Sequence, residues 1–267
     1  MTAFSVRAAT AADHAAYARL CPELGVDDPI ATPERFAAEM AETTLVAVGE
    51  AGEALGYSFY QPMQSAAYVR HVVTAPEARR RGVARALLEA VATRARESGC
   101  ESWCLNVEPR NAAARALYEG LGFELVYHSQ VQRFAWALLE HHHPPLEEHA
   151  WLIDPSADEA VEKAMRLEAG QLALGRAAGR VLMMLEDPDK EVVGMAQFDP
   201  AFPGAYPFRV ARPELALDLL HALRSHARTG DPWLQLCIEG QPEVAALLRE
   251  RGAEVRFDMM HLRGSLG

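Results

Sequence analysis

Four arginines lie close together around one glycine, in the order Arg79, Arg80, Arg81, Gly82 and Arg85. They stand where a predicted strand, residues 66–75, gives way to a predicted amphipathic helix, residues 82–99. The first turn of a helix has unpaired backbone N–H groups and the positive end of the helix dipole. A glycine there lets the backbone come close to a ligand because it carries no Cβ. The pattern predicts a phosphate-binding site with arginines supplying outer charge.

Other interpretations of this turn differ in their support. A helix start with solvated arginines is the simplest alternative, because short glycine motifs are weak signals. The turn lacks the Gly-Lys-Ser/Thr of a P-loop and the three glycines of a dinucleotide-binding fingerprint. An arginine patch for nucleic acid is disfavoured because the chain carries a net charge of -11.

A second segment, "NVEPRNAAARALYEGLGF" from Asn106 to Phe123, follows in order. Together with "RRRGVA" at residues 79–84 it resembles the GNAT superfamily of acyl-CoA-dependent N-acyltransferases. The family's first signature is Arg/Gln-x-x-Gly-x-Gly/Ala, and its second has an Asn, a helix bearing Leu-Tyr-Glu, and Gly-Phe. The resemblance covers residues 4–137.

The resemblance implies acetyl-CoA as cosubstrate and assigns roles by position. The strand end should hydrogen-bond the pantetheine arm through the backbone of Val72, Val73 and Thr74. The helix start should hold the pyrophosphate, and this set comprises Arg79, Arg80, Arg81, Gly82, Val83, Ala84 and Arg85. Asn111 should contact the pantetheine or position the last helix, and Tyr118 should lie near the sulfur as general acid.

The chemistry of thioester aminolysis supports the role of Tyr118. A thiol has a pKa of about 8.5 and a phenol of about 10, so a tyrosine can protonate a departing thiolate and stay a donor at neutral pH. A backbone N–H of the central strand can stabilise the oxyanion. The alternative for Tyr118 is a packed aromatic side chain on an amphipathic helix.

The general base is less clear from the sequence. Several family members have a glutamate on the strand before the second signature, where this chain has Asn106. His71 is the near-neutral titrating group of the central strand, although it could equally be a partly buried strand histidine. Glu108 is a further candidate, and the substrate could also arrive deprotonated. Because family members that acetylate protein N-termini often carry the glutamate, Asn106 favours a small-molecule amine as acceptor.

The surrounding residues predict alternating strands and helices. In the first half, strands are expected at 4–9, 66–75, 102–107 and 123–136, a hairpin at 44–61, and helices at 10–24, 32–42, 82–99 and 111–122. In the second half, strands are expected at 150–155, 233–239 and 253–264, a hairpin at 180–198, and helices at 156–174, 213–227 and 242–252.

The element order of the second half repeats that of the first. Without gaps, at an offset of 130, four identities appear: Trp103 with Trp233, Ala116 with Ala246, Leu117 with Leu247, and Gly122 with Gly252. A shared order with such identities indicates an internal duplication. We therefore expect two tandem domains, residues 1–138 and 150–267, joined by a linker at 139–149.

The second half lacks the residues that carry the chemistry. Leu248 stands where Tyr118 is expected, and Gln241 where Asn111 is expected. The segment "VARPELALDLL" has no arginine–glycine turn, only a proline start at Pro213. This domain is expected to keep the fold without an acyl-CoA site.

Composition limits the remaining possibilities. No apolar run reaches the about 18–20 residues of a membrane span. No secretory signal is seen, and the 4 cysteines form no Cys-x-x-Cys pair, which predicts a cytoplasmic protein with reduced thiols. His141, His142 and His143 are adjacent, so they point in different directions and no metal site is expected.

The sequence thus predicts an α/β (α+β) protein with two GNAT-like domains, each a mixed, mostly antiparallel twisted sheet flanked by helices. The first would transfer an acetyl group from acetyl-CoA to a primary amine by direct attack in a ternary complex. A non-catalytic acyl-CoA-binding sensor or scaffold is the alternative. The expected partner is a small-molecule amine, without nucleic acid or membrane, for a monomer or homodimer.

Overall fold

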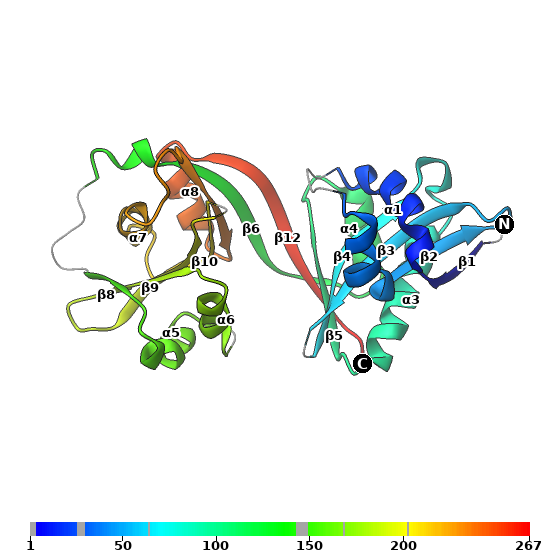
Figure 1. Ribbon diagram of the computed structural model, residues 1–267, viewed down its shortest axis with the longest axis horizontal. Coiled ribbons are helices and arrows are strands. Elements are labelled where there is room, and N and C mark those ends of the chain that lie inside the picture. Colours follow the sequence, from blue (N-terminus) through cyan, green and yellow to red (C-terminus); the bar gives the residue numbers. More distant parts are fainter. Residues whose placement is uncertain (1–3, 26–29, 64, 143–148, 168, 202) are drawn as a thin grey trace. The chain divides into compact units, whose positions relative to one another are not determined.

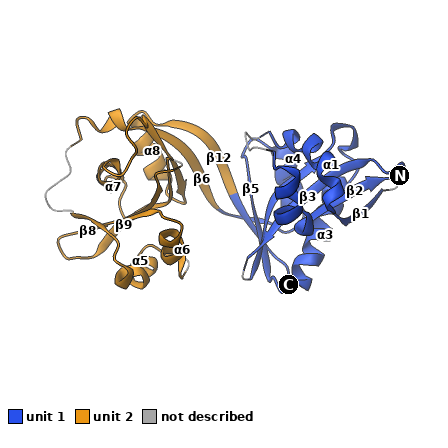
Figure 2. Cartoon of the chain, in the orientation of Figure 1, with its two compact units in different colours: residues 1–126, 261–267 blue, residues 127–260 orange. Residues whose placement is uncertain are grey.

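The computed structural model describes residues 4–25, 30–63, 65–142, 149–167, 169–201 and 203–267. The chain divides into two compact units (Figures 1 and 2). Unit 1 comprises Met1–Val126 and His261–Gly267, and unit 2 comprises Tyr127–Met260. The predicted mixed α/β class is confirmed, with a mostly antiparallel sheet and helices in each unit.

Unit 1 is built on strands in the order β1-β2-β3-β4-β5, followed by the end of β12. Its strands are β1 (Phe4–Ala8), β2 (Thr44–Gly49), β3 (Ala54–Pro62), β4 (Ala66–Thr74) and β5 (Ser102–Val107), with β12 (Glu254–Ser265). Its helices are α1 (His14–Leu20), α2 (Pro33–Arg35), α3 (Val83–Glu97) and α4 (Ala112–Glu119). Strands β1 to β4 pair antiparallel in order, and β4 pairs with β5 in parallel.

Helices cover both faces of the sheet of unit 1. The ring of Tyr57 on β3 packs against Tyr17 of α1, while the neighbouring Gly56 lies against Val83 of α3. Successive strand residues point to opposite faces, so α1 and α3 lie on opposite sides of the sheet. The apolar stripe of α3, which includes the fully buried Leu87 and Leu88, explains the helix predicted at 82–99.

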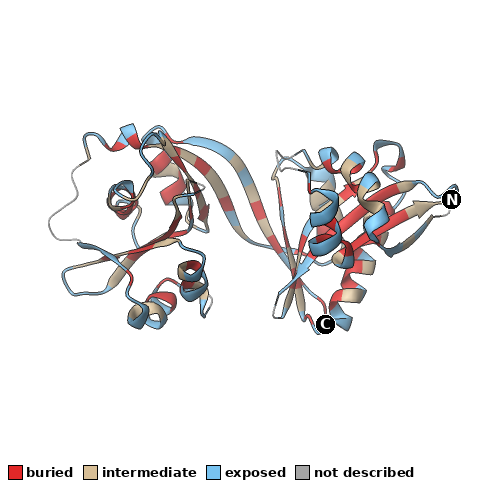
Figure 3. Cartoon of the chain, viewed as in Figure 1, coloured by how far each residue is buried: buried red, intermediate tan, exposed pale blue. Residues whose placement is uncertain are grey.

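Unit 2 repeats this arrangement with strands in the order β6-β11-β10-β9-β8-β7. Its strands are β6 (Glu124–Ala135), β7 (His149–Leu152), β8 (Val181–Glu186), β9 (Val192–Asp199), β10 (Gly204–Val210) and β11 (Trp233–Glu239). Its helices are α5 (Asp158–Ala164), α6 (Gln171–Ala177), α7 (Leu215–Arg224) and α8 (Pro242–Glu250). Buried residues follow the strands of this unit (Figure 3), and seven of the ten residues of α7 are buried.

Two strands pass from one unit to the other, and the units therefore differ from the predicted domains 1–138 and 150–267. Most of β6 pairs with β11 in unit 2, from Ser129 opposite Glu239 to Ala135 opposite Trp233. The end of the chain returns to unit 1, where the N–H of Leu266 donates to the carbonyl of Glu101 at 2.9 Å. Strand pairing decided the boundary, because each sheet takes its last strand from the other half of the sequence. Residues 143–148 of the predicted linker lie outside the described residues.

The duplication is visible in the elements, but one of its identities is coincidental. Strands β6 and β12 begin and end 130 residues apart, and α4 and α8 begin 130 apart. In β5 and β11, however, Trp103 is buried and matches the buried Leu234, whereas Trp233 is half-buried under the guanidinium of Arg133. The two strands are therefore related by 131 residues, and the agreement of Trp103 with Trp233 is wrong as a structural equivalence.

Three other expectations need correction. Strand β10 follows the predicted hairpin but was not expected, because Pro207 interrupts its apolar run. The helix predicted at 156–174 is two helices, α5 and α6. The helix predicted at 32–42 starts as α2 and continues as π and 3₁₀ turns.

Candidate active site

A gap opens between the two parallel strands of unit 1. Strand β4 pairs with β5 only from Ala66 to Val69, opposite Ser102 to Leu105. At that point β4 contains a bulge, since Phe59 faces His71 while Tyr60 faces Val69. Beyond the bulge, residues 71–74 stay paired with β3 but not with β5. The edge of β4 that faces the gap is therefore open to a ligand.

The end of β4 offers hydrogen-bonding groups to this gap. The N–H of Ala75 donates to the carbonyl of Leu55 on β3 at 2.9 Å. Because an antiparallel ladder alternates, the N–H and C=O of Val72 and Thr74 point away from β3, whereas those of Val73 point toward it. The Oγ1 of Thr74 is buried and has no hydrogen-bond partner in the described residues. Burying such a polar atom costs free energy unless a ligand or a water molecule forms a hydrogen bond with it.

The start of α3 presents a row of N–H groups. Gly82 is its N-cap with φ of 82°, and Arg80 also has a positive φ of 63°. Within the described residues, the N–H groups of 80–85 donate to no backbone carbonyl at normal hydrogen-bond geometry, and the first helical bond is from Ala86 to Gly82. A Cβ on Gly82 would meet nothing within 4 Å. The left-handed φ, rather than contact inside the chain, requires glycine here.

The arginine side chains around Gly82 differ in their partners. Arg79 forms an ion pair with Glu23 at 2.5 Å. Arg81 donates to the carbonyl of Glu77 at 3.5 Å, and Arg85 reaches the carbonyl at the end of α4 at 3.5 Å. The Arg80 guanidinium has no partner within the described part of the chain. Positive charge is therefore available beside the open N–H row.

The helix of the second signature, α4, places Tyr118 against the sheet. Asn111 caps this helix, because its Oδ1 accepts from the N–H of Ala114 at 3.1 Å. The ring of Tyr118 packs edge-on against Phe123 at 5.8 Å, and Phe123 stacks on Trp103 at 4.3 Å. Burial raises the pKa of Tyr118 to about 12, so its hydroxyl stays protonated at neutral pH.

His71 lies on the opposite face of the sheet, among aromatic rings on the α1 side. Its Nδ1 is 3.2 Å from the Tyr57 hydroxyl, and its ring lies edge-on to Tyr57 and Phe59. Glu108 is paired with Arg110 at 2.5 Å, with the arginine side chain 86% exposed. The predicted base candidates are thus one strand histidine in an aromatic cluster and one ion-paired carboxylate, whose side chain is 28% exposed.

Three hydrogen-bonded polar side chains lie on the face of the sheet that carries His71, and the sequence did not predict this group. Asn106 of β5 donates from Nδ2 to the Tyr68 hydroxyl at 2.9 Å, and its Oδ1 lies 2.9 Å from Nδ1 of His261. His261 belongs to β12, so its position in the second half of the sequence hid it. The signal that could have found it is the return of the last strand to the first sheet.

Unit 2 fills the equivalent positions with its own groups. Its helix α7 follows β10 through residues 212–214 only, and the N–H groups of Leu215, Ala216 and Leu217 donate to carbonyls three residues earlier at 3.2, 3.1 and 3.4 Å. Gln241 donates from Nε2 to the carbonyl of Val210 at 2.5 Å, across the end of the central strand. No comparable row of free N–H groups remains there.

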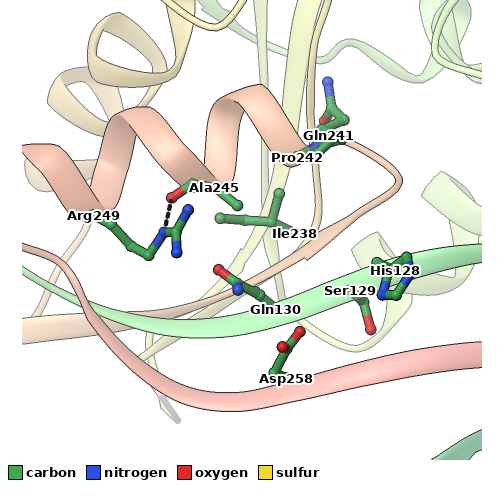
Figure 4. A pocket seen from close by; sticks show the side chains of 9 residues that line it. All are labelled: His128, Ser129, Gln130, Ile238, Gln241, Pro242, Ala245, Arg249 and Asp258. Carbon is green, nitrogen blue, oxygen red and sulfur yellow. Dashed lines mark hydrogen bonds between the residues drawn. The ribbon is translucent and has the colours of Figure 1, made fainter. Parts of the chain in front are cut away.

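A pocket of about 210 Å³ lies in unit 2, beside the start of α8 (Figure 4). Its walls carry His128, Gln130, Gln241 and Asp258, and Arg249 is bonded to the carbonyl of Ala245 at 3.3 Å. No group of three or more metal-ligating side chains occurs in the described residues. Among the helices that the structure describes, none is long and apolar enough to cross a membrane.

The groups in unit 1 fit the chemistry of acetyl-CoA. The N–H row and Arg80 suit a pyrophosphate, and the open edge of β4 with the unpartnered Thr74 Oγ1 suits an amide-containing arm. Comparison with known families agrees: residues 14–123 match the acetyltransferase (GNAT) family. No curated protein matches the sequence of the chain.

Solved structures share the fold of the whole chain. A GCN5-related N-acetyltransferase from Sphaerobacter thermophilus is 19% identical with a TM-score of 0.69, covering 98% of this chain and 96% of that one. A putative acetyltransferase from Pyrococcus horikoshii is 15% identical with a TM-score of 0.62, covering 98% and 89%. A tandem GNAT protein from the clavulanic acid biosynthesis pathway is 17% identical with a TM-score of 0.57, covering 100% and 99%. Residues 14–123 of this chain therefore match the GNAT family of acetyltransferases, and the chain as a whole shares the fold of these solved structures, which include a tandem GNAT protein.

Proposed function

We propose that unit 1 transfers an acetyl group from acetyl-CoA to a primary amine of a small molecule, by direct attack in a ternary complex. The observation that carries this proposal is the N–H row of residues 80–85 beside the open edge of β4. The N–H row suits a pyrophosphate, and the open edge of β4 suits an amide-containing arm. A single ligand that carries both groups would occupy both places.

In this proposal the strand and the helix start divide the binding of acetyl-CoA. The backbone of Val72 to Thr74 holds the pantetheine arm, and the N–H groups of Arg80 to Arg85 hold the pyrophosphate. Arg79 supports the turn through its pair with Glu23. Asn111 acts indirectly, because its side chain caps α4 and thereby fixes Tyr118.

Tyr118 is the proposed general acid. The amine nitrogen forms a bond to the thioester carbonyl carbon and loses a proton, the C–S bond breaks, and the thiolate takes the phenolic proton. Solvent returns a proton to the phenolate. A raised pKa keeps the phenol loaded before each turnover, and a nearby backbone N–H of β4 can stabilise the oxyanion.

His71 is the candidate base that the sequence supplies, on the face opposite α3. Asn106, in place of a carboxylate, supports a small-molecule acceptor. Unit 2 is proposed to be catalytically silent, since its helix start is closed by its own hydrogen bonds.

A panel of primary amines tests the proposal, with release of free CoA measured for the full chain. We expect amine-dependent release of CoA and acetylated product. A non-catalytic sensor would bind acetyl-CoA, measured by calorimetry, without releasing thiol for any amine. Binding without turnover would therefore replace the transferase by the sensor, and absence of binding would reject both.

A further inference from the structure

The second half of the sequence contributes a histidine to the sheet of unit 1. His261 lies where β12 re-enters this unit, beside β5 (Figure 2). Two further bonds hold the returning segment: Arg263 donates to Ser102 at 2.9 Å, and Arg96 of α3 donates to the carbonyl of Leu266. The position of His261 is thus fixed by the strand that carries it.

Asn106 determines which nitrogen of His261 carries the proton. The Nδ2 of Asn106 donates to the Tyr68 hydroxyl, so its Oδ1 is the atom directed at His261 Nδ1. A carbonyl oxygen only accepts hydrogen bonds, so Nδ1 must be the donor. In the neutral ring the lone pair then belongs to Nε2. By contrast, Nδ1 of His71 faces a hydroxyl, which can donate or accept.

This chain of side chains lies on the face opposite Tyr118. In β5, Trp103 and Leu105 are buried on the side of Phe123 and Tyr118, whereas Asn106 points the other way. The strand pair β4–β5 comes apart one residue beyond Tyr68, after Val69. A group held in the gap would therefore have Tyr118 on one side and the Asn106–His261 pair on the other.

We propose that His261 is the general base for the amine, held in its Nδ1–H tautomer by Asn106. This inference rests on the proposed function and deepens it. As the N–C bond forms, Nε2 takes one proton from the attacking nitrogen. The C–S bond then breaks, Tyr118 protonates the thiolate, and the imidazolium returns its proton through solvent to the phenolate. Charges and protons balance over the cycle.

The surroundings of His261 keep it neutral. Burial, and then the charge of Arg263 on the same strand, lower the pKa of His261 below its usual value. From β5 the facing groups are Asn106 and Cys104, and burial raises the pKa of that thiol, so neither adds a negative charge. A base must be deprotonated to act. Activity should therefore fall at acid pH through a pKa below that of an ordinary histidine.

The decisive experiment compares His261→Ala with His71→Ala in the full chain, using an amine that the wild type acetylates. For His261→Ala we expect kcat to fall about 10²–10⁴-fold, the usual contribution of a general base. The affinity for acetyl-CoA should stay within about twofold, since general acid–base groups act on the transition state. Added imidazole should restore part of the activity of this variant and not of His71→Ala. A merely structural role would show no such rescue.

The results of this experiment distinguish failure of the His261 assignment from failure of the proposed function. An active wild type with a His261→Ala variant within threefold of it, or rescue confined to His71→Ala, would overturn the assignment and leave the transferase intact. An inactive wild type on all amines would overturn both. Nitrogen-15 NMR of the wild type adds a measurement free of turnover: a protonated Nδ1 and an unprotonated Nε2 are expected, and the reverse tautomer would contradict the assignment. His226→Gln, in unit 2, controls for loss of a histidine.

Discussion

The helices that follow the central strands of the two units start in different ways. In unit 1, residues 76–82 form a turn with two left-handed residues, and α3 begins with its N–H groups unbonded to backbone. In unit 2, residues 212–214 lead straight into α7, and its first N–H groups bond to the carbonyls just before them. The same fold thus yields an open or a closed helix start according to the length of one turn.

The ends of the central strands of the two units are bonded by different side chains. Thr74 and Val210 occupy equivalent places, opposite Gly56 and Gly194. In unit 2 the carbonyl of Val210 is taken by Gln241, the first residue before α8. In unit 1 the corresponding Asn111 is one methylene shorter and turns to its own helix instead. The carbonyl of Thr74 accepts instead from Nε of Arg79 at 3.4 Å, so the two strand ends are bonded by side chains from different elements.

The largest effect is expected for Gly82→Glu, which changes the start of α3 in unit 1. A residue with a Cβ strains at φ of 82°, and its carboxylate would repel a pyrophosphate at the N–H row. We expect loss of acetyl-CoA binding, beyond about 100-fold, or about 2.7 kcal/mol. Calorimetry measures it. Gly52→Glu is the matched control, because Gly52 has φ of 84° in a hairpin turn with open space around it. Equal affinities for both folded variants would remove the N–H row from the site.

Tyr118→Phe tests the chemical difference between the units, since unit 2 has Leu248 on the equivalent helix. The ring packing against Phe123 remains, so acetyl-CoA affinity should be unchanged while kcat falls about 10²–10⁴-fold. Single-turnover kinetics and calorimetry measure the two effects. Tyr206→Phe removes a hydroxyl that donates to Glu239 in unit 2, and it should leave kcat unchanged. A Tyr118→Phe variant within a few-fold of wild type, with chemistry rate-limiting, would exclude the tyrosine as acid.

Gly264→Val tests how each sheet closes. A Cβ on Gly264 would lie 2.5 Å from Nε1 of the buried Trp103, so a larger side chain must displace that indole. Overpacking of this kind destabilises by about 1–3 kcal/mol. In unit 2 the positions equivalent to Trp103 and Gly264 carry Leu234 and Phe134, which lie opposite each other on β11 and β6. There the larger side chain belongs to the other strand. Urea unfolding measures the change, and a Gly264→Val protein as stable as wild type would show that the strand can shift.

Gln241→Leu gives the smallest expected effect. It removes one hydrogen bond to Val210, which is worth about 1 kcal/mol in unfolding free energy. It should not create a second acetyl-CoA site, because the N–H groups at the start of α7 remain bonded. Titration should give one equivalent of acetyl-CoA per chain for both wild type and variant. Two equivalents in either would show that the helix start of unit 2 opens on binding.

The local elements around Gly82 in unit 1 could be predicted from the sequence alone. The strand, the turn around Gly82 and the amphipathic α3 depend on neighbouring residues, so their periodicity and glycine placement predict them. The same holds for the repeat of elements between the halves. Strand β10 was not predicted, because Pro207 interrupts its strand pattern and the strand is stabilised by its neighbours in the sheet.

Which half of the sequence completes each sheet depends on contacts between distant strands. Hydrogen bonds between distant strands leave no periodic signal along the chain, so β12 reads as the last strand of the second domain although its end joins the first. His261 meets Asn106 for this reason alone, at a separation of 155 residues. The structural equivalence between β5 and β11 likewise follows from burial. The buried Trp103 corresponds to the buried Leu234, although Trp233, an identical residue, stands one position earlier.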